Sequence, residues 1–275
     1  MNVAKLEEGA SPFWAPRFKQ LQQTQAIVLQ SGERVPVNVA DSLDEEAPFD
    51  LVIVTTKAFQ VDAFLPALLR SKAASLHFLF ANFNPERIRD ALPGRRLAFG
   101  MPSIQSWIDA DGAIKISISK RQKTLHSDQR WVELFETAGL PSAFEADMMG
   151  WLRWHAPMTV AFEMVCVAGE RRHSGATWRE ARTMARGAKG GFAILRGLGY
   201  EMHSSKKSLN GMPLFALTFL LWMVSKMKDF RVLLASGERE ARAEADAIMA
   251  AAAKDPALAV ARKAVAATKI PCLTG

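Results

Sequence analysis

Residues 50–60 read Asp-Leu-Val-Ile-Val-Thr-Thr-Lys-Ala-Phe-Gln, a short apolar run that ends in a lysine. An unbroken apolar segment of this length is typical of a strand that is buried on both faces, and such strands belong to parallel sheets. Ligands of open α/β sheets bind at the carboxyl ends of the strands. Lys57 is therefore predicted to emerge where a ligand would bind.

The segments on either side of this strand alternate between strand and helix patterns. The predicted elements are strands over 51–55, 76–81 and 96–100 and helices over 61–70 and 86–92. This order predicts a parallel sheet with right-handed crossovers. Upstream, residues 25–30 and 35–39 flank a Ser-Gly-Glu-Arg turn and predict a hairpin.

A different strand pattern follows the turn signal Asp109-Ala-Asp-Gly112. Alternating apolar residues over 114–118 predict a half-exposed, antiparallel strand. Ser127 is the expected cap of a helix over 128–138 that Gly139 ends. A short strand over 143–145 is expected to close this part of the fold.

From Met148 onward only helical spacing is evident. Four helices are predicted, over 148–168 with a kink at Pro157, over a Ser174-capped segment to 198, over 214–228 and over 238–253. The predicted fold class is α/β: an incomplete Rossmann-like parallel-sheet domain over residues 1–147, followed by an all-α domain over 148–275.

Charge, cysteine content and apolar runs indicate which kinds of ligand and which compartment to expect. The net charge is +7, but the basic residues are spread along the chain among acidic ones, which favours an anionic small ligand over nucleic acid. Cys166 and Cys272 form no Cys-x-x-Cys pair, and no apolar leader follows Met1, so a cytoplasmic protein is expected. The apolar run 212–224 is shorter than the ~20 residues of a spanning helix, which favours a core or interface helix over a membrane segment.

Several motifs together resemble the ketopantoate reductase family, the 2-dehydropantoate 2-reductases. They are Val54-Thr-Thr-Lys57-Ala-Phe-Gln60, similar to the family's Val-x-x-Lys-Ala-x-Gln, then Phe80-Ala-Asn82, Phe99-Gly-Met-Pro102 and Asp147-Met-Met-Gly-Trp-Leu-Arg-Trp-His155. The resemblance is to a divergent branch. It implies NADPH-dependent reduction of a 2-keto acid or related ketone by a homodimer that acts on a small molecule, with neither nucleic acid nor membrane as partner.

The family's phosphate-binding Gly-x-Gly-x-x-Gly fingerprint does not occur in these 275 residues. Gly197-Leu-Gly199 ends a predicted helix and does not follow a strand, so we reject it as a phosphate loop. Leu6-Glu-Glu-Gly9 is similar to the end of the family's first crossover helix. On that interpretation the first strand and its glycine-rich turn would lie upstream of Met1, and two explanations stay open: a shortened enzyme or a degenerate relative.

The resemblance implies three residues near the cofactor. Lys57 matches the family's strand-end lysine, which lies beside cofactor and substrate, and Asn82 matches the asparagine after the next strand. Arg17 stands where a basic residue favours NADP through its 2′-phosphate. The alternatives are a solvated lysine, a turn-forming asparagine and an ordinary surface arginine.

Four further residues are candidates for catalysis or substrate binding. Arg153 occupies the position of the family's catalytic lysine, but arginine keeps its proton, so it could clamp a carboxylate or an oxyanion, or form a structural ion pair. His155 is a substitute acid or a core histidine. Ser236 and Glu244 best match the family's late Ser and Glu, although their spacing differs; a solvated helix face is the alternative.

Two other functions stay open beside the reductase. One is a non-catalytic interaction protein that uses the helical domain, and the other is a peripheral membrane protein that binds through residues 214–224. NADPH titration separates the reductase from the interaction protein, and carbonate-resistant pelleting with membranes would support the third function.

Overall fold

The chain forms two compact units in a computed structural model, which describes residues 2–4, 21–29, 31–108, 114–118 and 122–270. One unit comprises Met1–Thr56, Gln60–Phe80 and Arg87–Ala146; the other comprises Lys57–Phe59, Ala81–Glu86 and Asp147–Gly275. Two short segments that directly follow strands of the first unit therefore pack with the helices of the second.

The first unit is built on a five-stranded sheet with the order β11-β10-β7-β6-β5. Its strands are β5 (Val52–Val54), β6 (Leu76–Leu79), β7 (Leu97–Met101), β10 (Thr124–His126) and β11 (Ser142–Phe144). The strands β5, β6 and β7 are parallel neighbours, and β10 runs antiparallel to β7. Every residue of β6 is buried, as expected of a central strand in a parallel sheet.

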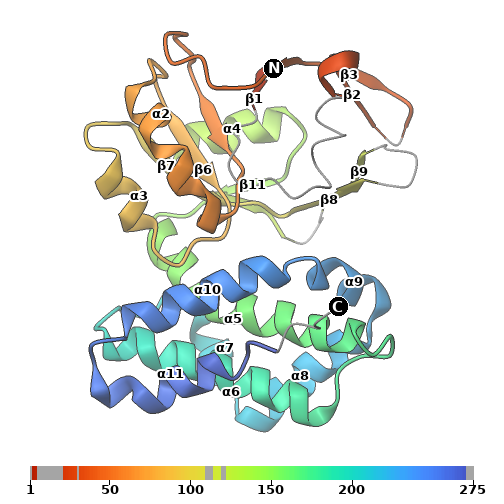
Figure 1. Cartoon of the computed structure of the whole chain (residues 1–275), viewed down its shortest axis with the longest axis vertical. Helices are drawn as coiled ribbons and strands as arrows, with labels where there is room; N and C mark the ends of the chain where they lie inside the picture. The colour runs from red at the N-terminus through yellow and green to blue at the C-terminus, as the bar shows by residue number, and fades with distance from the viewer. Residues whose placement is uncertain (1, 5–20, 30, 109–113, 119–121, 271–275) are drawn as a thin grey trace. The chain divides into compact units, whose positions relative to one another are not determined.

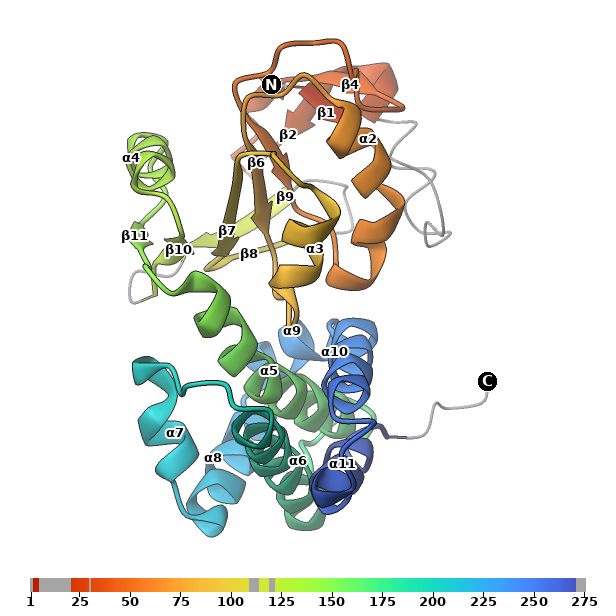
Figure 2. The same ribbon diagram turned by 90° about the vertical axis from the view of Figure 1, so that its left-hand side faces the viewer.

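Helices cover both sides of this sheet. They are η1 (Ala58–Ala63), α2 (Leu65–Arg70), α3 (Pro85–Ala91) and α4 (Gln129–Thr137). Figure 2 shows α2 and α3 on one side of β6 and β7 and α4 on the other. The predicted βαβαβ arrangement is confirmed, and the fold class with it. The expectation that the strand before Lys57 is buried on both faces is wrong, because β5 stands last in the described sheet and Ile53 is 42% exposed.

Three small two-stranded sheets complete the described part of this unit. The pair β2 (Ala26–Val28) and β3 (Arg34–Pro36) is the predicted hairpin, and β9 (Ile114–Ile118) is the predicted antiparallel strand. Its partner β8 (Ile104–Ile108) and the parallel pair β1 (Asn2–Ala4) and β4 (Asn38–Ala40) were not predicted. The turn expected at 109–112 lies outside the described residues.

The predicted cap of α4 is wrong. The side chain of Asp128 accepts from the backbone N–H of Arg130 and caps the helix, while the hydroxyl of Ser127 accepts from the backbone N–H of Phe99. Ser127 is therefore tied to strand β7. Gly139 ends the helix with a φ of +79°, as predicted, since that conformation is accessible to glycine.

The second unit is helical throughout its described part after residue 147. Its helices are α5 (Met148–Glu170), α6 (Trp178–Gly197), η2 (Ser204–Lys206), α7 (Lys207–Gly211), α8 (Leu214–Lys226), α9 (Lys228–Ala235), α10 (Glu238–Ala251), η3 (Pro256–Leu258) and α11 (Ala259–Ala266). The short helices were not predicted, because three to eight residues carry too little periodicity. The predicted Ser174 cap is wrong, since Thr177 and Glu180 form a capping box at α6.

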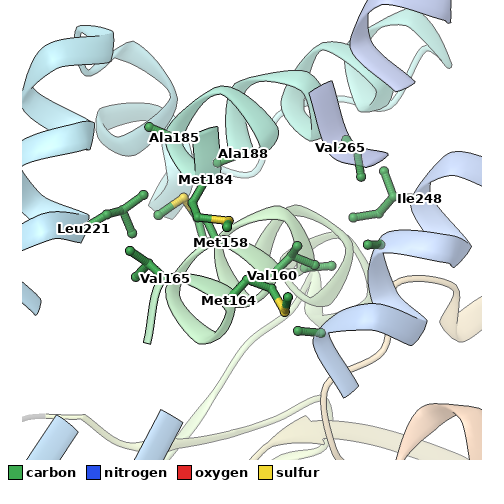
Figure 3. Packing of buried hydrophobic residues seen from close by; sticks show 14 of the residues in the cluster. Met158, Val160, Met164, Val165, Met184, Ala185, Ala188, Leu221, Ile248 and Val265 are labelled. Atoms are coloured by element: carbon green, nitrogen blue, oxygen red, sulfur yellow. The ribbon is translucent and has the colours of Figure 1, made fainter. Parts of the chain in front are cut away.

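Close contact between α5 and α6 organises the helical core. A Cβ added at Gly191 of α6 would lie 2.7 Å from the Cβ of Pro157 on α5, so glycine lets the two helices approach. Around them, the buried side chains include Met158, Met164 and Met184 and meet residues from α8, α10 and α11 (Figure 3). Cys166 is fully buried in this core, as predicted. The core is thus built by residues spread over more than a hundred positions.

No single helix in the described ranges has the length and apolar composition needed to cross a membrane. One bent pair, Ser204–Gly211 with Leu214–Lys226, meets that test only when its two pieces are taken together.

Candidate active site

The candidate site begins with the two segments that follow β5 and β6 and pack in the helical unit. The first holds Lys57, whose ammonium pairs with the carboxylate of Glu240 on α10. Lys57 keeps 52% of its side-chain surface exposed, whereas Glu240 keeps 9%. The pair therefore presents a cation to solvent while its partner carboxylate stays inside the protein.

The second segment is fixed to the helices by Phe83. Its side chain is buried in the helical core, and its backbone N–H bonds to the carboxylate of Glu244 on α10. The preceding residue, Asn82, is buried too. Its Oδ1 accepts from the backbone N–H of Asn84 at 3.0 Å, while its Nδ2 has no hydrogen-bond partner in the described part of the chain. The buried Nδ2 of Asn82 could thus donate a hydrogen bond to an oxygen atom of a bound ligand.

Three carboxyl groups gather around Lys57. Glu240 and Glu244 lie on α10, which packs against α5, and α5 contributes Glu163 (Figure 1). Burial, together with the charge of Glu240, raises the pKa of Glu163 to about 9 and that of Glu244 to about 8. Both groups hold a proton at neutral pH, because burial disfavours the charged form. We call Lys57, Glu163, Glu240 and Glu244 the carboxyl cluster.

The placement of Glu244 corrects one sequence interpretation. We expected a solvated helix face as the alternative for Ser236 and Glu244, but Glu244 is only 3% exposed. Ser236 is exposed, and its hydroxyl donates to the carbonyl oxygen of Leu233 at 2.6 Å. The solvated-face interpretation therefore suits Ser236 and is wrong for Glu244.

Arg153 forms an ion pair inside the helical unit. Its guanidinium pairs with the carboxylate of Glu86 in the segment after β6, and it lies 4.0 Å from the ring centroid of Tyr200. Only 8% of its side-chain surface is exposed. These contacts are those expected if Arg153 forms a structural ion pair. Its role in substrate binding stays a prediction.

His155 lies in an aromatic stack on the same helix. Its ring stacks on Trp151 with centroids 4.5 Å apart, and the ammonium of Lys206 lies 3.8 Å from the Trp151 centroid. Burial and the charge of Lys206 lower the pKa of His155 to about 3. A neutral imidazole at physiological pH has no spare proton to give, so this environment opposes the predicted role as an acid. Arg17 lies outside the described residues.

The sequence analysis missed Glu163, Glu240 and Glu86. A signal for the first existed, because Glu163 is the one acidic residue in the apolar stretch 148–168. An acid placed in a buried helix has a perturbed pKa and marks a candidate site. Glu240 follows the spacing of one helix face with Gly237 and Glu244, which was available from the sequence as well.

Parallel strands with polar residues after their ends, joined in one chain to an all-helical unit, define a two-unit fold of an α/β sheet followed by helices. Residues 13–125 match the family model described as ketopantoate reductase PanE/ApbA. The predicted resemblance to the ketopantoate reductase family is thus confirmed. The match ends before α4 and before the helices from α5 onward.

Solved structures extend the similarity of fold over nearly the whole chain. They include D-mandelate dehydrogenase in a ternary structure with NADH and anilino(oxo)acetate (13% identity, TM-score 0.59, 97% of this chain and 90% of that one). Others are the dimeric ketopantoate reductase from Staphylococcus aureus (12%, 0.56, 98% and 99%) and a PanE/ApbA family ketopantoate reductase from Ralstonia eutropha JMP134 (16%, 0.63, 92% and 88%). A search of curated proteins finds no match. At these identities the structures show the fold.

Proposed function

We propose that this protein is a ketopantoate reductase-like oxidoreductase that reduces a 2-keto acid or related ketone to the alcohol with NADPH. The observation that carries the proposal is the Lys57–Glu240 pair, in which a half-exposed lysine side chain shortly after the parallel strand β5 is held by a buried carboxylate. A fixed cation at this position can neutralise the negative charge that develops on a carbonyl oxygen during reduction.

The residues around Lys57 fit the nicotinamide end of such a cofactor. Asn82 has a buried amide donor without a partner among the described residues, and Lys57 brings a positive charge on a half-exposed side chain. In this proposal the two bind a carboxamide, a ribose hydroxyl or a substrate carboxylate. The cofactor would supply the hydride. In this proposal residues 1–147 form the cofactor domain and 148–275 the substrate and dimerisation domain, with Arg17 favouring NADP.

A fluorescence titration with NADPH tests the proposal. We expect saturable binding by the native chain and weaker binding by Lys57→Met and Asn82→Ala. Lys228→Met is the matched control, since Lys228 is an exposed lysine at the start of α9. No binding at millimolar NADPH would refute the reductase and leave the non-catalytic interaction protein. The substrate is then identified by following NADPH consumption with a panel of 2-keto acids and ketones.

The proposal includes a homodimer formed through the helical unit. Phe215, Phe219, Met223 and Met227 recur every four residues from α8 into the following turn, and all are exposed; Phe215 is 71% exposed. A continuous apolar stripe of this size is typical of a protein interface. Light scattering should give twice the chain mass, and Phe219→Glu should reduce it to one chain. A native monomer would contradict this part of the proposal.

A reduced compartment, the cytoplasm, completes the proposal. It is supported by Cys166, which is a free, buried thiol whose pKa is raised to about 12 by burial. Such a thiol acts as a core residue and is chemically inert.

A further inference from the structure

Glu163 places a carboxyl group where only glycine leaves space for it. A Cβ added at Gly237, the residue before α10, would lie 2.4 Å from the carboxyl carbon of Glu163 and 2.5 Å from its Oε2. The carboxyl of α5 therefore packs directly on the backbone at the start of α10. A larger residue at 237 would move this carboxyl away from the start of α10, because the contact is with the end of a flexible side chain.

The same face of α10 presents the other two carboxyl groups. Gly237, Glu240 and Glu244 are spaced by three and four residues, so they line one side of the helix. The charged and titratable groups that act on Glu163 are Glu240 and Glu244 from α10 and Lys57 from the segment after β5. Cys166 on α5 interacts with it too, as a neutral thiol.

Two buried oxygen atoms of the carboxyl cluster lack partners. Within the described residues, Oε2 of Glu163 and Oε2 of Glu244 are sealed from solvent and make no hydrogen bond. An unpaired buried carboxylate is costly, and a proton removes that cost. The cluster therefore stores protons beside the one ammonium that pairs with Glu240.

A proton source is what the rest of the proposed site lacks. Arg153 occupies the position of the family's acid, yet a guanidinium keeps its proton and here binds Glu86 and Tyr200. The imidazole of His155 is neutral. Lys57 can donate a proton, but then needs one returned.

We propose that Glu163 is a positioning residue that returns a proton to Lys57 through Glu240 after each reduction. The inference rests on the proposed function. Hydride from a dihydronicotinamide forms the new C–H bond, and the carbonyl π electrons move to oxygen. An N–H bond of Lys57 breaks as the alcohol O–H forms. Glu163 then gives its proton to the Glu240 carboxylate, and Glu240 passes a proton on to the Lys57 amine. Solvent reprotonates Glu163, a residue that is only partly buried, before the next turnover.

The stored proton is tested without cofactor or substrate. Infrared spectra of the native chain at neutral pH should contain the carbonyl absorption of the protonated carboxyls of Glu163 and Glu244, and Glu163→Gln should remove the Glu163 share of that absorption. The matched control is Glu133→Gln, because Glu133 is exposed on α4. If Glu163→Gln leaves the protonated-carboxyl bands unchanged, Glu163 holds no proton and the inference is overturned.

The link to Lys57 is tested separately, by following the Lys57 ammonium signal by NMR as the pH rises. In the native chain the signal should change as Glu163 titrates, and Glu163→Gln should remove that change. Gly237→Ala should perturb it too, since the added Cβ displaces the carboxyl. Gly211→Ala is the control, because a Cβ there meets nothing within 4 Å. Identical Lys57 curves in native chain and Glu163→Gln would exclude the relay.

Turnover gives the last readout. We expect Glu163→Gln to lower kcat by about 10²-fold, the lower end of what general acid–base catalysis contributes, with KM unchanged. Glu163→Asp should recover part of the rate, since it restores an acid. An unchanged kcat would overturn the relay even with NADPH bound. A chain that binds no NADPH would instead refute the proposed reductase, while the infrared result would still report on the stored proton.

Discussion

The helical unit holds two groups of charged residues, Arg153 with its partners and the carboxyl cluster, and they differ in how completely their polar atoms are paired. The guanidinium of Arg153 has both a carboxylate and an aromatic ring beside it, and it is almost fully buried. The carboxyl cluster holds three acids around one lysine and leaves two buried oxygen atoms unpaired in the described structure. A satisfied pair fixes a segment in place, whereas an unsatisfied cluster responds to ligands and protons. Arg153, at the position of the family's catalytic lysine, is thus the more fully satisfied of the two.

The largest expected effect comes from removing the cation of the carboxyl cluster. Lys57→Met takes away the charge that would stabilise the developing alkoxide and donate the proton, so ketone reduction should fall by about 10²- to 10⁴-fold. NADPH consumption measures it, with Lys228→Met as the control. Full activity in Lys57→Met would show that the cluster is not the site and would break the comparison.

Breaking the satisfied pair should affect stability more than chemistry. Arg153→Met leaves Glu86 without its partner, and we expect the free energy of unfolding to fall by about 3 kcal/mol, the lower end for a buried ion pair because Glu86 keeps some solvent contact. Urea unfolding measures the loss, and Arg153→Met with Glu86→Met should lose less than the sum of the two single variants. Unchanged stability with lost reduction would make Arg153 a catalytic residue.

The dependence of stability on pH distinguishes the two groups further. Folding raises the pKa of Glu163 from its ordinary 4.5 to about 9, so between these values the folded chain binds a proton that the unfolded chain has released. Stability should therefore fall as pH rises through that window, with a slope of at most about 1.4 kcal/mol per pH unit from this group. Glu163→Gln should remove this contribution in urea unfolding, and Glu133→Gln should not. A native chain that gains stability over the same window would contradict the assignment.

The smallest expected effect concerns the ring beside Arg153. Tyr200→Leu removes the cation–π contact while keeping an apolar side chain, so the free energy of unfolding should fall by about 1 kcal/mol. Thermal unfolding measures it, and reduction at saturating substrate should be unchanged. A loss of activity larger than the loss of stability would indicate that Tyr200 contacts the substrate.

The apolar pattern was enough to predict the parallel strands and the long helices. The run that ends at Lys57 is the predicted strand, but its predicted burial on both faces is wrong, because β5 stands last in the described sheet and Ile53 is 42% exposed. Helical spacing was continuous after residue 148 because long elements repeat their period many times. Strand β10 and the short helices were not predicted, since three to eight residues do not define a period. The caps at Asp128 and Thr177 were missed because neighbouring serines offered the same chemistry.

By itself, the sequence determined the fold class and the position of one lysine and one asparagine after successive strands, because hydrophobic period and strand order follow from local residue pattern. The tertiary structure alone decided which charges meet. Glu240 and Lys57 are separated by 183 positions in the sequence, and no local pattern encodes their contact. Burial then determines protonation, and for this reason Glu163 and Glu244 become acids that hold their protons, while Arg153 pairs with Glu86.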